Sequence, residues 1–382
     1  MLSPDYDCSI VNLISAVAGS QAPAADLYPP LALLDNARCQ QRPVALLVID
    51  GLGYQFLQQF PDSALARHTV QRLTSVFPTT TATAVTALAL GVPAQQHGIT
   101  GWFTYLRELG SVVMPLPFMP RGGGSCYKDL GVSAAMMLDA RPLLPRLNRG
   151  VQVSSPSYIS DSDFSAALYG SVPRAPHQNL AHFFDQLGRG LKQPDQPLVW
   201  GYWTELDAVA HQYGCQSPEA VAHFHQIDQQ FEHWLTQLAG SDALVLVTAD
   251  HGLIDVADEQ QLQMEQHPEL QALLRLPLCG EPRAAFCYLR PGSQSDFEQY
   301  MAEHFSGLFE VVPSEQLLSQ QLFGRGAPSS RLADRIGDLT VLAKQQAVIK
   351  DRLVQERPFS QRGVHGGLSA EELYVPLVMV EP

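Results

Sequence analysis

The sequence is poor in basic residues for its length. Its 24 Lys and Arg stand against 38 Asp and Glu, which gives a formal net charge of -14. A field of this sign repels polyanions, and binding along a nucleic-acid backbone requires clustered Lys and Arg. We therefore expect no nucleic-acid polymer as a partner. A small phosphorylated substrate remains compatible, because bound cations can reverse the local field.

Long apolar runs and paired cysteines are also absent. No segment reaches the roughly 18 uninterrupted apolar residues of a membrane span. The first eight residues contain two acids and no Lys or Arg, whereas a secretory signal begins with a positive region. The six cysteines form no C-x-x-C pair, which is typical of reduced thiols. We expect a cytoplasmic protein without membrane contact, and its oligomeric state is left open.

The chain does contain enough apolar residues for a substantial core. Of its 382 residues, 46% are hydrophobic and 16% are charged. Short apolar runs alternate with helical segments, which predicts an α/β fold with a central, mostly parallel sheet flanked by helices. We expect one domain over residues 1–382, with a small α/β cap inserted at 256–335. The run Gly337–Ala343 is expected to return to the main core.

Two of the apolar runs end in residues that can carry chemistry. Val44–Ile49 is followed by Asp50, and Leu244–Ala249 is followed by Asp250 and His251. Ligands in open α/β sheets bind just beyond the carboxyl ends of such strands. Carboxylate and imidazole are ligands that suit zinc. The alternative is that these residues only form turns or cap helices.

Further candidate ligands follow in the second half of the chain. Asp207 and His211 are four residues apart, so in a helix they share one face. That spacing suits a metal site, but it also occurs in ordinary surface pairs. His365 lies in a loop flanked by glycines, an unusual place for a structural histidine.

A threonine cluster, Thr79–Thr81, precedes an Ala-rich helix that should end at Gly91. Backbone N–H groups at a helix start are unpaired and favour anions, so a phosphate could dock there. Alternatively, the threonines serve only as helix caps. A metal ion nearby would activate a threonine hydroxyl, which is otherwise a poor nucleophile at neutral pH.

Taken together, the candidates supply a mixed oxygen and nitrogen ligand set. Three aspartates and three histidines suit two zinc-like ions, with manganese or iron as alternatives. Two such ions clamp the attacking and leaving oxygens of a phosphoryl transfer.

The order of these motifs resembles the alkaline phosphatase superfamily, and most closely its nucleotide pyrophosphatase/phosphodiesterase branch. The resemblance covers most of residues 44–380. It is carried by Asp50-Gly51, Pro78-Thr79-Thr80-Thr81, Gly91 to Gly98, Asp207 with His211, Asp250-His251-Gly252 and His365-Gly366.

The resemblance implies an alkaline-phosphatase-like fold and two metal ions. One zinc would be held by Asp207, His211 and His365, and a second by Asp50, Asp250 and His251. In the family the second threonine of the Pro-Thr-x-Thr segment is the nucleophile, which points to Thr81. By sequence alone, Thr79 and Thr80 stay possible.

The sequence departs from this branch at one position. The branch usually carries Asn three residues after the nucleophile, where this chain has Ala84. The backbone N–H of Ala82, a neighbouring threonine or an unplaced Lys or Arg would have to replace that amide. Trp102 and Tyr105 are candidates for the substrate pocket, with core packing as the alternative.

We expect a metal-dependent hydrolase of phosphate esters that acts on phosphodiester or pyrophosphate bonds of nucleotide-like substrates. Its intermediate would be a phospho-threonine. The alternatives are a phosphomonoesterase or phosphonate hydrolase of the same superfamily, and a non-catalytic relative that binds metal.

Overall fold

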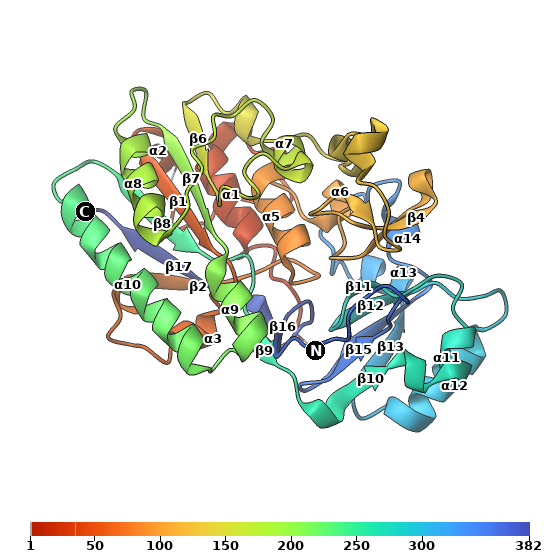
Figure 1. Cartoon of the computed structure of the whole chain (residues 1–382). Coiled ribbons are helices and arrows are strands. Elements are labelled where there is room, and N and C mark those ends of the chain that lie inside the picture. Colours follow the sequence, from red (N-terminus) through yellow and green to blue (C-terminus); the bar gives the residue numbers. More distant parts are fainter. Residues whose placement is uncertain (1, 35) are drawn as a thin grey trace.

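The computed structural model describes residues 2–34 and 36–382 and shows two lobes, each with its own sheet (Figure 1). The larger lobe is built on a six-stranded sheet in the order β2-β17-β8-β1-β7-β6. Its strands are β1 (Val44–Ile49), β2 (Thr69–Thr74), β6 (Val151–Ser154), β7 (Leu198–Trp203), β8 (Leu244–Thr248) and β17 (Tyr374–Val380). β6, β7, β1 and β8 are parallel, while β17 runs antiparallel to both β8 and β2. The expected mostly parallel sheet is confirmed.

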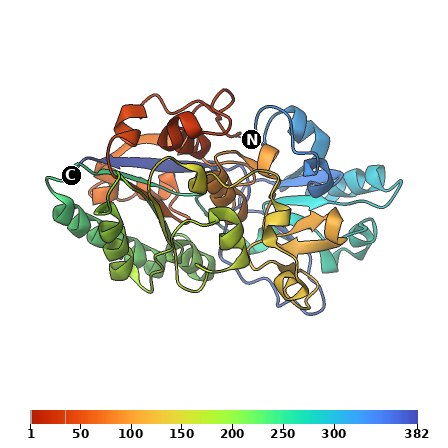
Figure 2. The ribbon, with the colours of Figure 1, turned by 90° about the horizontal axis from the view of Figure 1, so that it is seen from above.

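Helices cover both faces of this sheet. Figure 2 shows the N-terminal helices, in red, on one face and α8 and α10, in green, on the other. The helices of this lobe are α1 (Ile10–Ala18), α2 (Asn36–Gln40), α3 (Tyr54–Leu57), α4 (Ala64–Arg67), α5 (Thr81–Leu90), α6 (Ala94–His97), α7 (Asp163–Tyr169), α8 (Leu180–Leu191), α9 (Glu205–Tyr213), α10 (Pro218–Leu238) and α15 (Ala370–Leu373). Because helices pack on both faces, all residues of β1, β7 and β8 are buried, as their continuous apolar sequences predict.

The smaller lobe is the cap, with a four-stranded antiparallel sheet in the order β11-β12-β14-β13. Its strands are β11 (Cys279–Glu281), β12 (Ala284–Cys287), β13 (Phe309–Pro313) and β14 (Leu339–Ala343), and a parallel pair is formed by β10 (Gln261–Gln263) and β15 (Val348–Lys350). Its helices are α11 (Pro268–Ala272), α12 (Gln294–Phe305), α13 (Ser314–Ser319) and α14 (Leu332–Arg335).

The expected return of the run Gly337–Ala343 to the main core is wrong. Leu339–Ala343 forms β14, which pairs with β12 and β13 inside the cap sheet. A buried apolar run predicts a strand but does not reveal which of two sheets it joins. The strands of the cap therefore continue beyond residue 335, as far as β15.

Two small ladders join the lobes. A hairpin sheet of β3 (Thr104–Leu106), β4 (Ser111–Met114) and β5 (Met119–Pro120) meets the cap sheet through a bridge between Phe103 and Gly280. The strands β9 (Ile254–Asp255) and β16 (Gly363–Val364) pair where the chain enters and leaves the cap.

Within the described ranges, no helix has both the length and the apolar character needed to cross a bilayer. The same residues contain no disulfide.

Candidate functional site

Asp50 and Asp250 meet because their strands are neighbours. β1 and β8 are parallel with Val48 opposite Thr248, so each aspartate leaves its strand two residues further on, at the same level. Gly252 then lets three segments approach closely. A Cβ at this position would lie 2.0 Å from the carbonyl oxygen of Glu371. Only glycine fits there without displacing the backbone.

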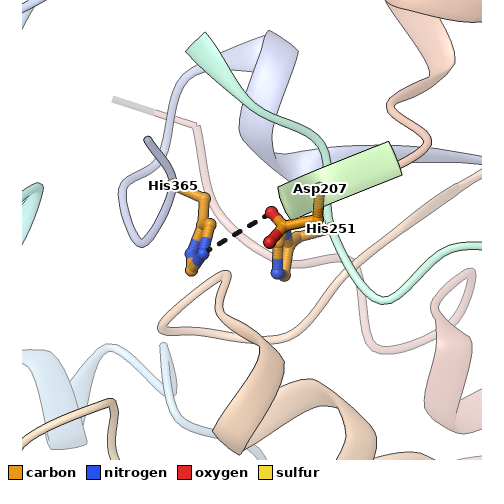
Figure 3. Close-up of side chains that lie close together, drawn as sticks. All are labelled: Asp207, His251 and His365. Carbon is orange, nitrogen blue, oxygen red and sulfur yellow. Dashed lines mark ion pairs between the residues drawn. The ribbon is translucent and has the colours of Figure 1, made fainter. Parts of the chain in front are cut away.

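The remaining ligands come from α9 and from the strand that leaves the cap. Asp207 and His211 lie one turn apart on α9, with Asp207 Oδ2 3.2 Å from His211 Nε2. His365 follows β16, whose pairing of Val364 with Ile254 brings it beside His251. Figure 3 shows Asp207, His251 and His365 pointing toward one another, with 3.9 Å between His365 Nε2 and Asp207 Oδ1. All six candidate ligands thus gather at one end of the large sheet.

Each of the three aspartates has one oxygen held and one without a partner. Asp250 Oδ1 accepts hydrogen bonds from the N–H groups of Gly51 and His251, and Asp50 Oδ2 accepts one from the hydroxyl of Tyr202. Asp50 Oδ1, Asp207 Oδ1 and Asp250 Oδ2 are buried and form no hydrogen bond. Buried carboxylate oxygens without partners are costly unless a cation binds them. This donor set therefore fits divalent metal ions.

Two of the histidines are oriented by backbone carbonyls. His251 Nδ1 lies 3.1 Å from the oxygen of Gly252, and His211 Nδ1 lies 2.7 Å from the oxygen of Gly363. Protonation of Nδ1 in each ring satisfies these contacts and leaves Nε2 as the ligand atom. Metal-binding histidines are commonly fixed in this way by a carbonyl behind the ring.

Distance brings five of the six ligands into two groups of three that share His251. The ligand atoms of Asp50, Asp250 and His251 lie within 4.8 Å of one another, and so do those of Asp207, His251 and His365. The first group is the set that the resemblance implies for one zinc. In the second group His251 stands where His211 was expected, although His211 lies beside Asp207.

The electrostatics of the cluster also favour a bound cation. Burial and the nearby Asp250 and Asp207 carboxylates raise the pKa of Asp50 well above its usual value. Burial, opposed by His251 and reinforced by Asp207, raises the pKa of Asp250. Burial would lower the pKa of His211, but Asp207 outweighs it and raises this pKa to about 9. A positive ion at the centre would relieve the repulsion between the carboxylates.

The three threonines have different partners. Thr79 Oγ1 donates to the carbonyl oxygen of Gly367 at 2.7 Å, and Thr80 Oγ1 donates to Glu281 Oε1 at 2.6 Å. Thr81 Oγ1 instead lies 3.1 Å from His251 Nε2. Of the three hydroxyls, that of Thr81 alone faces the ligand cluster.

Thr81 begins α5, and Ala82 follows it in the first turn of this helix. The helix ends at Gly91, which has a φ of 75°, as expected. Ala84, where the related branch carries Asn, is buried at 0% exposure and offers no polar group.

A cavity of about 630 Å³ opens beside the ligand cluster, between the lobes. Its walls include Thr81, Asp207 and His365 from the larger lobe and Glu281 and Lys350 from the cap. The rest of its lining is largely apolar and aromatic, with Val85, Trp102, Phe103, Leu116, Tyr158, Ile159, Phe164 and Tyr169 among its members.

The structure places the two aromatic candidates, Trp102 and Tyr105, differently. Trp102 lines the cavity, as does its neighbour Phe103. Tyr105 is not among the lining residues. It packs edge-on against Tyr288, with ring centroids 5.2 Å apart. The strand β3 directs its side chain into the packing between hairpin and cap, which is the packing alternative that the sequence left open.

Sequence reasoning missed three residues at this site. Tyr202 donates to Asp50, Glu281 contacts Thr80, and Lys350 lines the cavity. Tyr202 could have been found, because it lies near the end of an apolar strand that precedes the Asp207 helix. Glu281 and Lys350 carry no local motif, and only the folding of the cap brings them here.

Comparison with known proteins gives a consistent result. The profile of the type I phosphodiesterase/nucleotide pyrophosphatase family matches residues 125–367, a span that contains five of the candidate ligands but begins after Asp50 and Thr81. A search of curated proteins found no match to the chain.

Solved structures with the same fold cover most of the chain. Murine ectonucleotide pyrophosphatase/phosphodiesterase 5 is 17% identical, with a TM-score of 0.66 over 89% of this chain and 88% of its own. An inactive variant of that murine protein in complex with AMP has a TM-score of 0.65 at 17% identity, over 88% of this chain and 87% of its own. Phosphonoacetate hydrolase from Sinorhizobium meliloti, in complex with phosphonoformate, is 17% identical, with a TM-score of 0.64 over 89% of this chain and 90% of its own.

The family is metal-dependent, and this chain has two groups of residues that could each hold an ion. Because the family profile matches more than half of its length, the chain belongs to the type I phosphodiesterase/nucleotide pyrophosphatase family and is a hydrolase of that family.

Proposed function

We propose that the protein hydrolyses phosphodiester or pyrophosphate bonds of nucleotide-like substrates, with Thr81 as the nucleophile. The observation that carries the proposal is the position of Thr81 Oγ1, 3.1 Å from His251 Nε2 and on the wall of the cavity. The hydroxyls of Thr79 and Thr80 are each engaged by a partner outside the ligand cluster.

The reaction runs through a covalent intermediate on Thr81. Its Oγ attacks phosphorus in line, the bond to the leaving oxygen breaks, and phospho-Thr81 remains. Water then attacks phosphorus on the side opposite Oγ, the Oγ–P bond breaks, the phosphoryl product leaves, and a proton from the water restores the Thr81 hydroxyl. Two divalent ions, zinc in this proposal and manganese as the alternative, would lower the pKa of the attacking hydroxyl and neutralise charge on the phosphoryl oxygens.

The residues of the chain hold the reacting group in place. Asp50, Asp250 and His251 would bind one ion, and Asp207, His211 and His365 the other. The N–H of Ala82, in the first turn of α5, is positioned for a phosphoryl oxygen, because the first N–H groups of a helix lack partners within the helix. This contact substitutes in part for the amide that Ala84 lacks.

The cavity supports a nucleotide-like substrate. Aromatic side chains such as Trp102, Phe103 and Tyr158 offer faces on which a base can stack, and the volume of about 630 Å³ is within the range of small-molecule sites. The murine neighbour that was solved with AMP has the same fold.

We retain the cytoplasm as the proposed location of the protein in the cell.

The decisive experiment replaces the nucleophile and leaves the ligands in place. Thr81→Ala should abolish hydrolysis of bis(p-nitrophenyl) phosphate, while the zinc content by elemental analysis stays unchanged. Thr83→Ala, two positions further along α5, is the control and should retain most activity. Full activity in Thr81→Ala would show that another group attacks phosphorus.

A second candidate is hydrolysis of phosphate monoesters or phosphonates on the same ligands. It is favoured by Ala84 and by the likeness in fold to phosphonoacetate hydrolase. The ratio of kcat/KM for p-nitrophenyl phosphate to that for bis(p-nitrophenyl) phosphate separates the two. A lack of chelator-sensitive hydrolysis of either compound would contradict both candidates.

A further inference from the structure

Lys350 is the one Lys or Arg among the residues that line the cavity, within the part of the chain that the structure describes. It is the last residue of β15, so its side chain reaches the cavity from the cap. The chain is poor in this residue type, and its lysines are Lys128, Lys192, Lys344 and Lys350. A lysine in a largely apolar wall therefore calls for an explanation.

The acids around Lys350 are engaged by other partners. Asp351 Oδ1 lies 2.7 Å from Arg121 Nη2, and Glu356 Oε1 lies 2.8 Å from Arg121 Nε. Glu281 Oε1 accepts hydrogen bonds of 2.6 Å from the hydroxyl of Thr80 and from the N–H of Trp102. Three nearby carboxylates thus already have donors.

The ammonium group of Lys350 forms no direct ion pair with these carboxylates. Among the described residues no carboxylate oxygen lies within 4.0 Å of its Nζ, and the recorded contact is with the face of the Phe359 ring, 4.7 Å away. Burial lowers the pKa of Lys350 to about 8, with Glu281 opposing the shift, so the group is still mostly charged at pH 7. Because its Nζ has no direct carboxylate partner and its side chain lines the cavity, an anionic group bound there could contact it directly.

The position of Lys350 separates it from the reacting phosphorus. Its strand is joined to the segment after Glu281, since the N–H of Ile349 donates to the oxygen of Pro282 at 2.9 Å. Glu281 in turn contacts Thr80, which precedes Thr81. The strongest electrostatic influences on Lys350 are Glu281, Arg121 and Asp351, residues outside the metal cluster. An anion at Lys350 would thus sit on the cap side of the cavity, apart from the group that Thr81 attacks.

We propose that Lys350 binds a second anionic group of the substrate, a phosphate or a carboxylate carried on the part of the molecule that faces the cap. This inference rests on the proposed function, because it assigns the other end of the same substrate. It narrows the substrate class to phosphate or phosphonate compounds with two separated anionic groups. Lys350 is then a specificity-determining residue.

Turnover of matched substrates provides the first test. In Lys350→Met, kcat/KM for ATP or for phosphonoacetate should fall at least about tenfold, chiefly through KM, because one charge-assisted contact is lost. The value for bis(p-nitrophenyl) phosphate, which has no second anion, should change less than about twofold. Whichever of ATP and phosphonoacetate is affected identifies phosphate or carboxylate as the group bound. An equal loss on all substrates, or no loss on any, overturns the proposal.

Two further variants separate charge from packing. Lys350→Arg keeps the positive charge and should recover most of the lost kcat/KM. Lys344→Met removes a lysine of the same lobe, whose Nζ donates to the backbone oxygen of Ser306 at an exposed site, and should leave all values unchanged. Thermal unfolding confirms that each variant is folded.

A binding measurement keeps this test independent of turnover. In zinc-loaded Thr81→Ala, calorimetry should show that adding Lys350→Met weakens binding of ATP or phosphonoacetate at least about tenfold. If the wild type hydrolyses nothing but this loss is seen, the proposed function fails and the anion site stands. If neither compound binds to zinc-loaded Thr81→Ala, or both bind equally well in the double variant, the anion site is excluded.

Discussion

The two halves of the ligand cluster are built in different ways. Asp50, Asp250 and His251 follow the central strands β1 and β8, and the side chains of Asp250 and His251 are 0% exposed. Asp207 and His211 lie on α9 and His365 follows a two-residue ladder, and the side chain of His211 is 22% exposed. The first half is fixed by sheet register, whereas the second depends on one helix and one short loop.

This difference predicts that the two groups of ligands retain a metal ion for different lengths of time. Ligands held by a sheet lose little freedom on binding an ion, because their positions exist beforehand. Ligands on a helix face and a loop can shift more easily and are closer to solvent. We therefore expect the Asp50, Asp250 and His251 half to retain its ion longer when metal is withdrawn.

The strongest test of this comparison removes one ligand from each half. Asp250→Asn should lower kcat/KM for a phosphodiester by about 1000-fold or more, since metal contributes several kcal/mol to phosphoryl transfer. His211→Gln should cost roughly 100-fold and leave the other ion bound. Elemental analysis of both variants measures the metal retained. If both variants lose the same amount of metal, the two groups of ligands do not differ in how firmly they hold an ion.

The loop that carries His365 can be destabilised by a substitution that leaves all candidate metal ligands in place. Arg283 and Glu372 form a buried pair at 2.9 Å, and Glu372 Oε1 also accepts from the N–H of Gly367 at 2.7 Å, beside the His365 loop. Arg283→Met leaves a buried carboxylate unpaired and should lower the free energy of unfolding by about 3–5 kcal/mol.

The matched control for this variant is an exposed pair. Arg107 lies 3.4 Å from Asp334, with side chains 73% and 43% exposed. Arg107→Met should change the free energy of unfolding by less than about 1 kcal/mol. Urea unfolding of both variants gives the comparison. A small effect in Arg283→Met would mean that the loop is held by its other contacts.

The second half should also show a distinct dependence of zinc affinity on pH. The Asp207 carboxylate holds the pKa of His211 at about 9, against the effect of burial. A histidine ligand must be unprotonated, so binding below pH 9 displaces this proton. Apparent zinc affinity of this half should rise about tenfold per pH unit up to about pH 9 and then level off. Competition with a coloured chelator between pH 6 and 10 measures it, and a flat profile from 7 to 9 contradicts it.

The smallest expected effect on kcat/KM comes from the hydrogen bond that Tyr202 donates to Asp50. Tyr202 donates to Asp50 Oδ2, whereas His251 Nε2 lies 3.5 Å from the other oxygen, Oδ1. Tyr202→Phe removes one hydrogen bond to a charged group, worth about 1.5–3 kcal/mol at most. Because sheet register still places Asp50, we expect a loss in kcat/KM of about tenfold or less. A loss as large as that of Asp250→Asn would show that the register alone does not position Asp50.

The sequence was most informative where chemistry and secondary structure coincide. Asp50 and Asp250 could be placed together because each ends a continuous apolar run, and such runs form neighbouring buried strands. Their roles as metal ligands stay predictions, as does the role of Thr81. The structure adds that the Thr81 hydroxyl faces His251, while the neighbouring hydroxyls have other partners.

Contacts between the lobes could not be predicted in this way. Glu281 and Lys350 reach the cavity through the packing of the cap, and no local pattern indicates which sheet an apolar strand such as Leu339–Ala343 joins. The surroundings of Tyr105 could not be predicted for a related reason. A run of aromatics does not reveal which ring faces a cavity and which packs between elements, as Tyr105 does against Tyr288.

The insertion of the cap between His251 and His365 has a consequence for the synthesis of the protein. Asp50, Asp207 and His251 leave the ribosome before any cap strand, whereas His365 follows only after β15 is complete. A nascent chain that stops within the cap therefore presents an unfinished coordination site. The residue set of the second group is thus completed only after the cap has been made and has returned the chain to β16.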